Sequence, residues 1–174
     1  PENFKAPEGR AHTDEALILE MIRAGERAGL FLAYTYRLMI CFIFGEHEKA
    51  EQNAEKAKTY LDAGVGLYMF AVFYFYRALN QLAVFGRLPD SRKKEEWRKI
   101  EKAASRLRRW AAYGPGNHGH KSDLVEAEMA RVRGESLNAE SLYHRAADQA
   151  RENGFIQVEA LACELAALFY LQRG

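Results

Sequence analysis

The stretch GESLNAESLYHRA, residues 134–146, decides the fold that we expect for this chain. Gly134 is suited to end one helix, and the next helix starts within a few residues. On that second helix Ala139, Tyr143 and Ala146 follow one another at spacings of four and three residues, which places them on one face. A face of small, aromatic and small side chains lets helical hairpins pack tightly on their neighbours. The stretch therefore predicts a helical-repeat protein.

The same arrangement occurs earlier in the chain. Gly45 is followed by alanines at the offsets that separate Gly134 from its own face, and Gly86 occupies the corresponding place after an aromatic helix. The alanines are Ala50, Ala54 and Ala57. The intervals between these glycines exceed the tetratricopeptide period of about 34 residues. We therefore expect an all-α, tetratricopeptide-like right-handed superhelical stack of about eight antiparallel helices.

Length and composition agree with a single helical-repeat domain. The chain has 174 residues, and none of its four prolines interrupts a periodic segment. The net charge of +1 gives no global attraction to nucleic acid or anionic lipid. We expect an irregular tail over residues 1–11, helical hairpins or pairs over 12–64, 65–113 and 117–154, and a terminal helix over 155–173.

Within these units the pattern predicts individual boundaries. A polar helix is expected over residues 46–62, and a long charged helix over 92–113. The apolar stripe of the charged helix is Trp97, Ile100, Ala104, Leu107 and Ala111. The run GPGN at residues 114–117 is the clearest loop, after which Ser122 or Asp123 is expected to cap the next helix.

Cysteine usage and hydropathy indicate a cytoplasmic protein. Cys41 and Cys163 lie far apart in apolar stretches, and we expect both to be reduced core residues. The longest uncharged run, residues 63–76, is shorter than the roughly 20 residues of a membrane span and predicts a buried helix without membrane insertion. We also expect the chain to be a piece of a longer protein.

The sequence contains no motif for catalysis or for a cofactor. The phosphate-binding patterns GxxxxGK[ST] and GxGxxG are absent, as is the zinc motif HExxH. His118 and His120 stand beside Asp123, but two histidines lack the third and fourth ligands of a metal site, so we expect a solvated loop there. The prediction is a non-enzymatic protein with no cofactor and no metal.

A basic run raises the question of nucleic-acid binding. Residues 87–109 are rich in lysine and arginine and contain Trp97, with Trp110 directly after them. Both tryptophans fit the apolar stripe or its edge, and acidic residues interleave with the basic ones. We therefore favour a solvated helix face over a nucleic-acid site, with docking of another domain of the same protein as a third option.

The candidate binding site lies on the two aromatic inner helices. Arg37 and Arg77 precede the turn glycines by eight and nine residues, so both side chains could project into one groove of the stack. Tyr34, Tyr68, Tyr74 and Asn80 are the other candidate site residues. Guanidinium groups with tyrosines suit an acidic peptide or a small carboxylate. The alternative is core packing, with each arginine paired to a neighbouring glutamate.

Several segments carry a resemblance to a known family. They are RAGLF at residues 27–31, YLDA at 60–63, FYFY at 73–76, WAA at 110–112, LVEAE at 124–128 and ARENGF at 150–155. Together they are similar to the helical-repeat region of large bacterial multidomain signalling proteins, and the likeness covers most of residues 26–173. Those proteins combine a serine/threonine kinase domain, an AAA-type ATPase domain, the helical region, a GAF domain and a histidine kinase.

The resemblance implies a regulatory or scaffolding module. Its partners would be another protein or the neighbouring domains of the same chain, and a homo-oligomer is left open. The alternatives are a fragment that contributes to a nucleotide-dependent enzyme activity of its parent, or a ligand-sensing domain.

Overall fold

The computed structural model describes residues 14–173, and all of its regular structure in that range is helical. The predicted tail over residues 1–11 and the first two residues of the helical unit predicted over 12–64 lie outside the described residues. The eight α-helices are α1 (Asp14–Ala24), α2 (Arg27–Ile43), α3 (His47–Lys58), α4 (Tyr68–Val84), α5 (Asp90–Tyr113), α6 (Pro115–Arg133), α7 (Ser136–Glu152) and α8 (Ile156–Leu171). Two short 3₁₀ helices, η1 (Leu61–Gly64) and η2 (Phe85–Arg87), flank α4. The all-α prediction is confirmed for this part of the chain.

Left-handed glycines make four of the turns. Gly25, Gly45, Gly134 and Gly154 all have φ between 69° and 76°. After Gly134 the amide of Glu135 donates to the carbonyl of Ala130 at 2.9 Å, and after Gly45 the amide of Glu46 donates to Cys41 at 2.8 Å. This bond satisfies a carbonyl that the ending helix would leave unpaired. The predicted equivalence of Gly45 and Gly134 therefore extends to backbone geometry.

Gly86 does not share that geometry. Its φ is not positive, and it lies inside η2, so α4 ends in a tightened turn instead of a left-handed cap. The sequence comparison that grouped Gly86 with the other two glycines was wrong in this respect. A glycine after an apolar helix does not by itself specify the left-handed conformation.

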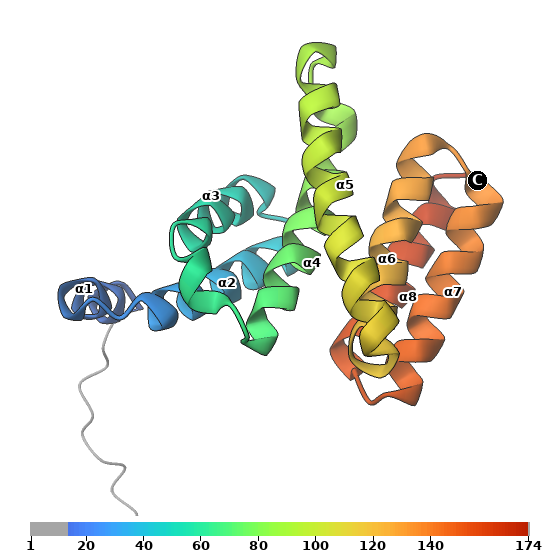
Figure 1. Ribbon diagram of the computed structural model, residues 1–174. Helices are drawn as coiled ribbons and strands as arrows, with labels where there is room; N and C mark the ends of the chain where they lie inside the picture. The colour runs from blue at the N-terminus through green and yellow to red at the C-terminus, as the bar shows by residue number, and fades with distance from the viewer. Residues whose placement is uncertain (1–13, 174) are drawn as a thin grey trace, which may run out of the picture.

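The helices contact one another in an alternating pattern. The four helices α2, α4, α6 and α8 touch successively, while α3, α5 and α7 each pack on the helix before and the helix after. Figure 1 shows α1 to α3 at one end, the long α5 across the middle and α6 to α8 at the other end. The helices α2, α4, α6 and α8 therefore form one continuous row, which we call the inner row.

The stripes that defined the repeat are buried. Ala50, Ala54, Ala57, Ala139 and Ala146 are fully inaccessible to solvent, and Tyr143 is 1 % exposed. Small side chains at these positions allow close helix contacts. The predicted stripe of α5 also faces the core, with Ile100, Ala104 and Leu107 buried.

Two local expectations were wrong. α6 begins at Pro115 and not at Ser122, because proline is favoured in the first turn of a helix and Gly114 alone breaks the chain direction. Gly119 lies inside α6, and its missing side chain makes room for Gln149 of α7. The polar helix α3 ends at Lys58, and the segment up to Gly64 forms η1 against the Phe31 ring.

The prediction that both cysteines are core residues was also wrong for one of them. Cys163 is exposed, while Cys41 is partly buried.

The left-handed cap can be tested with two glycines. Gly134→Ala should lower the free energy of unfolding by about 1 kcal/mol, because a Cβ disfavours positive φ. Gly86→Ala is the matched control, since its backbone is not left-handed and no atom lies within 4 Å of the added Cβ. Urea unfolding measures both variants, and equal losses would contradict the distinction between the two turns.

Candidate functional site

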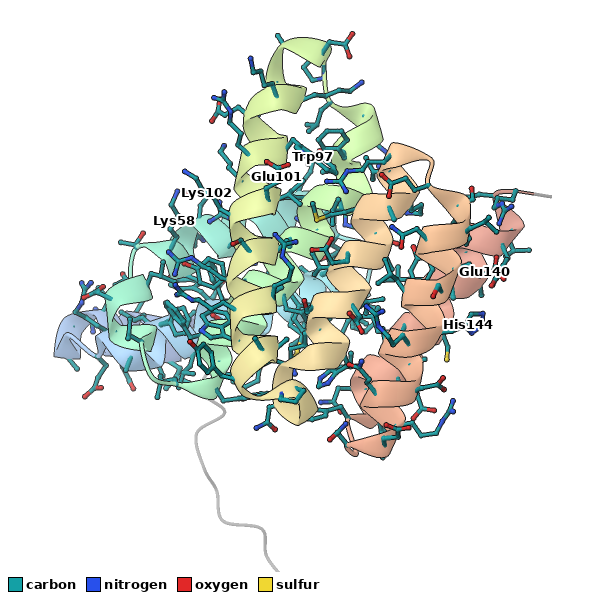
Figure 2. The ribbon with its side chains drawn as sticks, turned by 45° about the vertical axis from the view of Figure 1, so that its right-hand side comes forward. Lys58, Trp97, Glu101, Lys102, Glu140 and His144 are labelled. Carbon is teal, nitrogen blue, oxygen red and sulfur yellow. The ribbon has the colours of Figure 1, made fainter. Side chains whose placement is uncertain are left out.

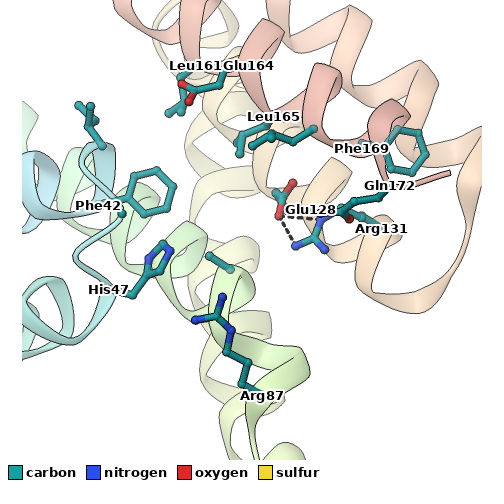
Figure 3. A pocket seen from close by; sticks show the side chains of 14 residues that line it. Phe42, His47, Arg87, Glu128, Arg131, Leu161, Glu164, Leu165, Phe169 and Gln172 are labelled. Carbon is teal, nitrogen blue, oxygen red and sulfur yellow. Dashed lines mark hydrogen bonds and ion pairs between the residues drawn. The ribbon is translucent and has the colours of Figure 1, made fainter. Parts of the chain in front are cut away.

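A groove of about 330 Å³ opens along the inner row of helices. It is lined by the end of α2, the end of α4, the second half of α6 and one face of α8. Figure 3 shows Phe42 and His47 on one side of this groove, and Leu161, Leu165 and Phe169 on the other. The groove thus joins segments from opposite ends of the chain, and we call it the inner groove.

The walls of the inner groove are mostly apolar. On the α2 side Phe42 is buried, but Ile43 is 50 % exposed. On the α8 side Leu161 is buried, and Leu168 is 47 % exposed. Apolar side chains half-exposed on both walls favour a ligand with apolar side chains of its own.

The floor of the groove is a buried polar network. Glu128 is 3 % exposed, and its Oε2 accepts hydrogen bonds from Nε and Nη2 of Arg131 at 3.0 and 2.6 Å. The Tyr143 hydroxyl donates to the other carboxylate oxygen of Glu128. Arg131 Nη2 also donates to the carbonyl of Leu82 at 3.5 Å. Both carboxylate oxygens of Glu128 accept hydrogen bonds inside the network, so the floor is structural and not a vacant ion site.

The network changes how its members titrate. Burial raises the pKa of the Tyr143 hydroxyl, and the Glu128 carboxylate raises it further. Burial acts to lower the pKa of the Arg131 guanidinium, but the hydrogen bond and the charge of Glu128 outweigh it, so this pKa is raised. Tyr143 therefore remains a protonated donor across the physiological pH range.

Two charged side chains at the rim have no such partner. Among residues 14–173, neither the Arg87 guanidinium at the end of η2 nor the Glu164 carboxylate on α8 has a hydrogen bond or ion pair. Figure 3 shows them on opposite sides of the inner groove. An incoming segment would meet one basic and one acidic group at its edges.

His47 and Asn80 hold one wall in place. Asn80 is 1 % exposed, its side-chain amide donates to the His47 carbonyl at 3.1 Å, and its oxygen lies 2.9 Å from His47 Nδ1. The pair links the first residue of α3 to the middle of α4. Asn80, a predicted site residue, is thus a buried positioning residue behind the groove.

The predicted arginines lie in different surroundings. Arg77 forms ion pairs with Glu51, at 3.4 Å, and with Glu55 of α3. The coulombic attraction of Arg77 helps to lower the pKa of Glu55 although burial acts in the opposite direction. Arg37 is partly buried on α2 and has interactions of its own. Neither arginine lines the inner groove.

The predicted tyrosines are also distributed over several contacts. Tyr34 is buried and stacks on Tyr60 with ring centroids 6.2 Å apart. Tyr74 lies under the guanidinium of Arg106 at 5.0 Å. Tyr68 is 48 % exposed and lies 5.1 Å from the ammonium group of Lys121. The structure does not bring the six candidates into one cavity, and their role in binding stays a prediction.

The histidines beside Asp123 are not in a solvated loop, contrary to the sequence prediction. His120 is fully buried in α6 with its ring 4.3 Å from that of Phe155, and burial lowers its pKa to about 4. Asp123 accepts two hydrogen bonds of 2.6 Å from Arg145. No group of three or more potential metal ligands occurs in the described part of the chain.

The sequence did not predict that Lys121 is buried. It is 1 % exposed, and its ammonium group donates to the Asn117 carbonyl at 3.0 Å and lies 2.8 Å from His120 Nε2. The Phe155 ring lies 4.4 Å from the same nitrogen. Burial lowers the pKa of Lys121 to about 8. No local pattern signals such a residue, because a lysine next to a glycine-rich stretch resembles any surface lysine.

Most of the basic run lies in α5, and Trp97 is not an exposed stacking platform. Trp97 donates from Nε1 to Glu101 at 2.8 Å and packs on Phe85, with Arg133 4.8 Å above its ring. Figure 2 shows Trp97, Glu101 and Lys102 along this helix. Trp97 is therefore held by its own neighbours, as the apolar stripe predicted.

Comparison with protein-family models, with curated proteins and with solved structures found no match to this chain. Within residues 14–173 no helix has both the length and the apolar character that crossing a membrane requires. The geometry of the grooves is thus the basis for a functional proposal.

The floor of the inner groove can be tested by removing one hydroxyl. Tyr143→Phe should lower the free energy of unfolding by about 1–3 kcal/mol, because buried Glu128 loses a donor. Tyr170→Phe is the control, since that hydroxyl is on an exposed side chain 3.1 Å from His144. Urea denaturation compares the two. A loss for Tyr143→Phe no larger than the control would show that the network contributes nothing to stability.

Because the pKa of Lys121 is lowered, we expect the stability of the protein to increase as the pH rises from 8 to 10. This pKa is about 8 when folded and near 10.5 when unfolded, so the unfolded state binds more protons between these values and stability rises with pH there. Lys121→Met should be more stable than the wild type at pH 7 by up to about 3 kcal/mol. The difference should shrink from pH 8 toward pH 10 in chemical denaturation. Lys102→Met serves as the exposed control, and parallel curves for wild type and Lys121→Met would contradict the assignment.

Proposed function

We propose that this chain is a non-catalytic protein-interaction module whose inner groove holds a segment of a partner. The observation that carries the proposal is the convergence of α2, α4, α6 and α8 on one groove with half-exposed apolar side chains on both walls. Stacked helical hairpins commonly bind peptides on such an inner surface. The alternating contacts support a tetratricopeptide-like right-handed superhelix of antiparallel helices as the architecture.

The walls and rim of the groove define the chemistry of the partner segment. Ile43 and Leu168 favour apolar anchor residues, because burial of their exposed surface stabilises a complex. Arg87 and Glu164 favour a segment that carries one acidic and one basic side chain beside the anchors. An amphipathic helix or a short extended segment meets these conditions.

The cellular role that we propose is regulatory. The resemblance of residues 26–173 to the helical region of bacterial kinase, ATPase and sensor proteins supports a scaffold or relay in the cytoplasm. The partner segment would then come from a neighbouring domain of the same chain or from a second protein. The paired state of Arg77 favours structural packing at that position over recognition of an acidic peptide.

Groove variants test the interaction. Peptides selected from a random library on the wild-type protein should bind at least about tenfold more weakly to Ile43→Glu and to Leu168→Glu, because each substitution places a charge against an apolar anchor. Leu137→Glu is the matched control, since Leu137 is 83 % exposed and lies outside the groove. Fluorescence anisotropy of labelled peptides gives the dissociation constants.

Two outcomes would contradict the proposal. Either the library yields no enriched peptide, or the enriched peptides bind the groove variants and the control equally well. Circular dichroism of all variants establishes that each remains folded.

A further inference from the structure

A second cavity lies between the start of α4, the end of α5 and the start of α6, and shares no lining residue with the inner groove. Its volume is about 500 Å³. Its walls come from the segment at residues 65–67, from Tyr68 and Phe70, from Arg106, Arg109 and Trp110, and from His118. We call it the α4–α6 pocket.

The charged groups of this pocket all have one sign. Arg106 and Arg109 lie one turn apart on α5, and no acidic residue lines the pocket. In the described residues neither guanidinium has an ion pair or a hydrogen bond. The ammonium group of Lys121 lies behind Tyr68 at 5.1 Å from its ring. Such a cluster of cations is unfavourable by itself and attracts an anion.

Arg106 and Arg109 differ from four other basic residues of the same helix. Arg92, Lys93, Lys99 and Arg108 are each paired with a carboxylate. Arg109 has no such partner in the described chain, and the Arg106 guanidinium lies 5.0 Å from the Tyr74 ring. Lys94, Arg98 and Lys102 also have no ion pair in the described chain, but they do not line the pocket. The end of α5 therefore presents unneutralised charge at the place where the cavity opens.

Aromatic rings form the other part of the pocket. Trp110 packs edge-on against Phe70, with centroids 5.9 Å apart, and Tyr68 is 48 % exposed beside them. Their faces can stack on a flat ring of a ligand. His118 adds a polar atom, because its Nδ1 is buried without a hydrogen-bond partner. Burial lowers the pKa of His118, and nearby Lys121 adds to this effect, so the imidazole is neutral at pH 7.

We infer that the α4–α6 pocket binds a small anion that carries a flat aromatic ring. The ring stacks on Tyr68 and Trp110, and a phosphate or carboxylate group is held by Arg106 and Arg109. Guanidinium groups form charge-assisted hydrogen bonds with both kinds of anion. The volume of the pocket is in the range of small-molecule sites.

Four probes separate the two parts of the ligand. Adenosine 5′-monophosphate and 1-naphthoate carry a ring and an anionic group, adenosine carries a ring alone, and inorganic phosphate carries the anion alone. Calorimetric titration of the full chain should show that at least one of the first two probes binds at least about tenfold more tightly than adenosine and phosphate. If adenosine 5′-monophosphate is the probe that binds, the anionic group of the ligand is a phosphate, and if 1-naphthoate binds, it is a carboxylate. Binding by neither, or equal binding by adenosine or by phosphate, would overturn the inference.

Charge-matched variants place the site. Arg106→Ala with Arg109→Ala should weaken binding of that probe by about tenfold or more. Arg98→Ala with Lys102→Ala removes the same charge from the same helix, at positions that line none of the described cavities, and should change binding by less than about twofold. Figure 2 shows Lys102 on α5. If both double variants weaken probe binding equally, the loss of affinity comes from the change in net charge, and the placement of the site at Arg106 and Arg109 is wrong.

A single variant covers the case in which the double variant does not fold. Arg109→Glu alone leaves the contact of Arg106 with Tyr74 intact and should abolish binding of the anionic probe by repulsion. Circular dichroism monitors its fold, and retention of binding by folded Arg109→Glu would overturn the inference.

Discussion

The carboxylate of Glu128 is the group on which the packing of the stack depends. A buried charge is costly unless it is paired and hydrogen-bonded. Arg131 pairs with Glu128 within α6, but the Tyr143 donor and the Leu82 acceptor are reached only when three helices keep one register. Tyr143 brings α7 to it, and Arg131 connects it to the end of α4 through the Leu82 carbonyl. A shift of α6 would leave the Arg131–Glu128 ion pair intact, because both residues lie on α6, but it would break the bond to Tyr143 of α7 or the bond to Leu82 of α4. Glu128 and Arg131 of this network also line the floor of the inner groove, so the groove floor and the contacts of α6 with α4 and α7 depend on the same residues.

The parts of the fold that the sequence predicted are those that rest on local signals. A left-handed glycine followed by an alanine stripe specifies a turn and one helix face within a few residues, and both are present at Gly45 and Gly134. The prediction of a loop at residues 114–117 was wrong, although two glycines beside a proline usually mark a loop. Here the glycines provide space for α7, since Gly116 faces Asn153 and Gly119 faces Gln149. That reason is tertiary and has no signature in the local pattern.

The candidate site was less predictable than the fold. An offset from a turn gives the position of a residue along its helix, but the direction of the side chain also depends on rotation about the helix axis. α4 is apolar on nearly all sides and so offers no polar face from which that rotation could be deduced. Glu51 and Glu55, one turn apart on α3, are what place Arg77 toward that helix. The α8 wall of the inner groove was missed for the same reason, because α8 is apolar all round.

The two cavities differ in how their charges are balanced, and α5 explains the difference. Four basic side chains of this helix, Arg92, Lys93, Lys99 and Arg108, pair with a carboxylate. Other cations of α5 have no ion pair in the described residues, but of these only Arg106 and Arg109 line the α4–α6 pocket. The neighbouring wall of that pocket is aromatic instead of acidic. Two cations beside aromatic rings in one cavity act on a ligand that fits the pocket, which is why we favour a small anionic ligand over a nucleic-acid strand at this place.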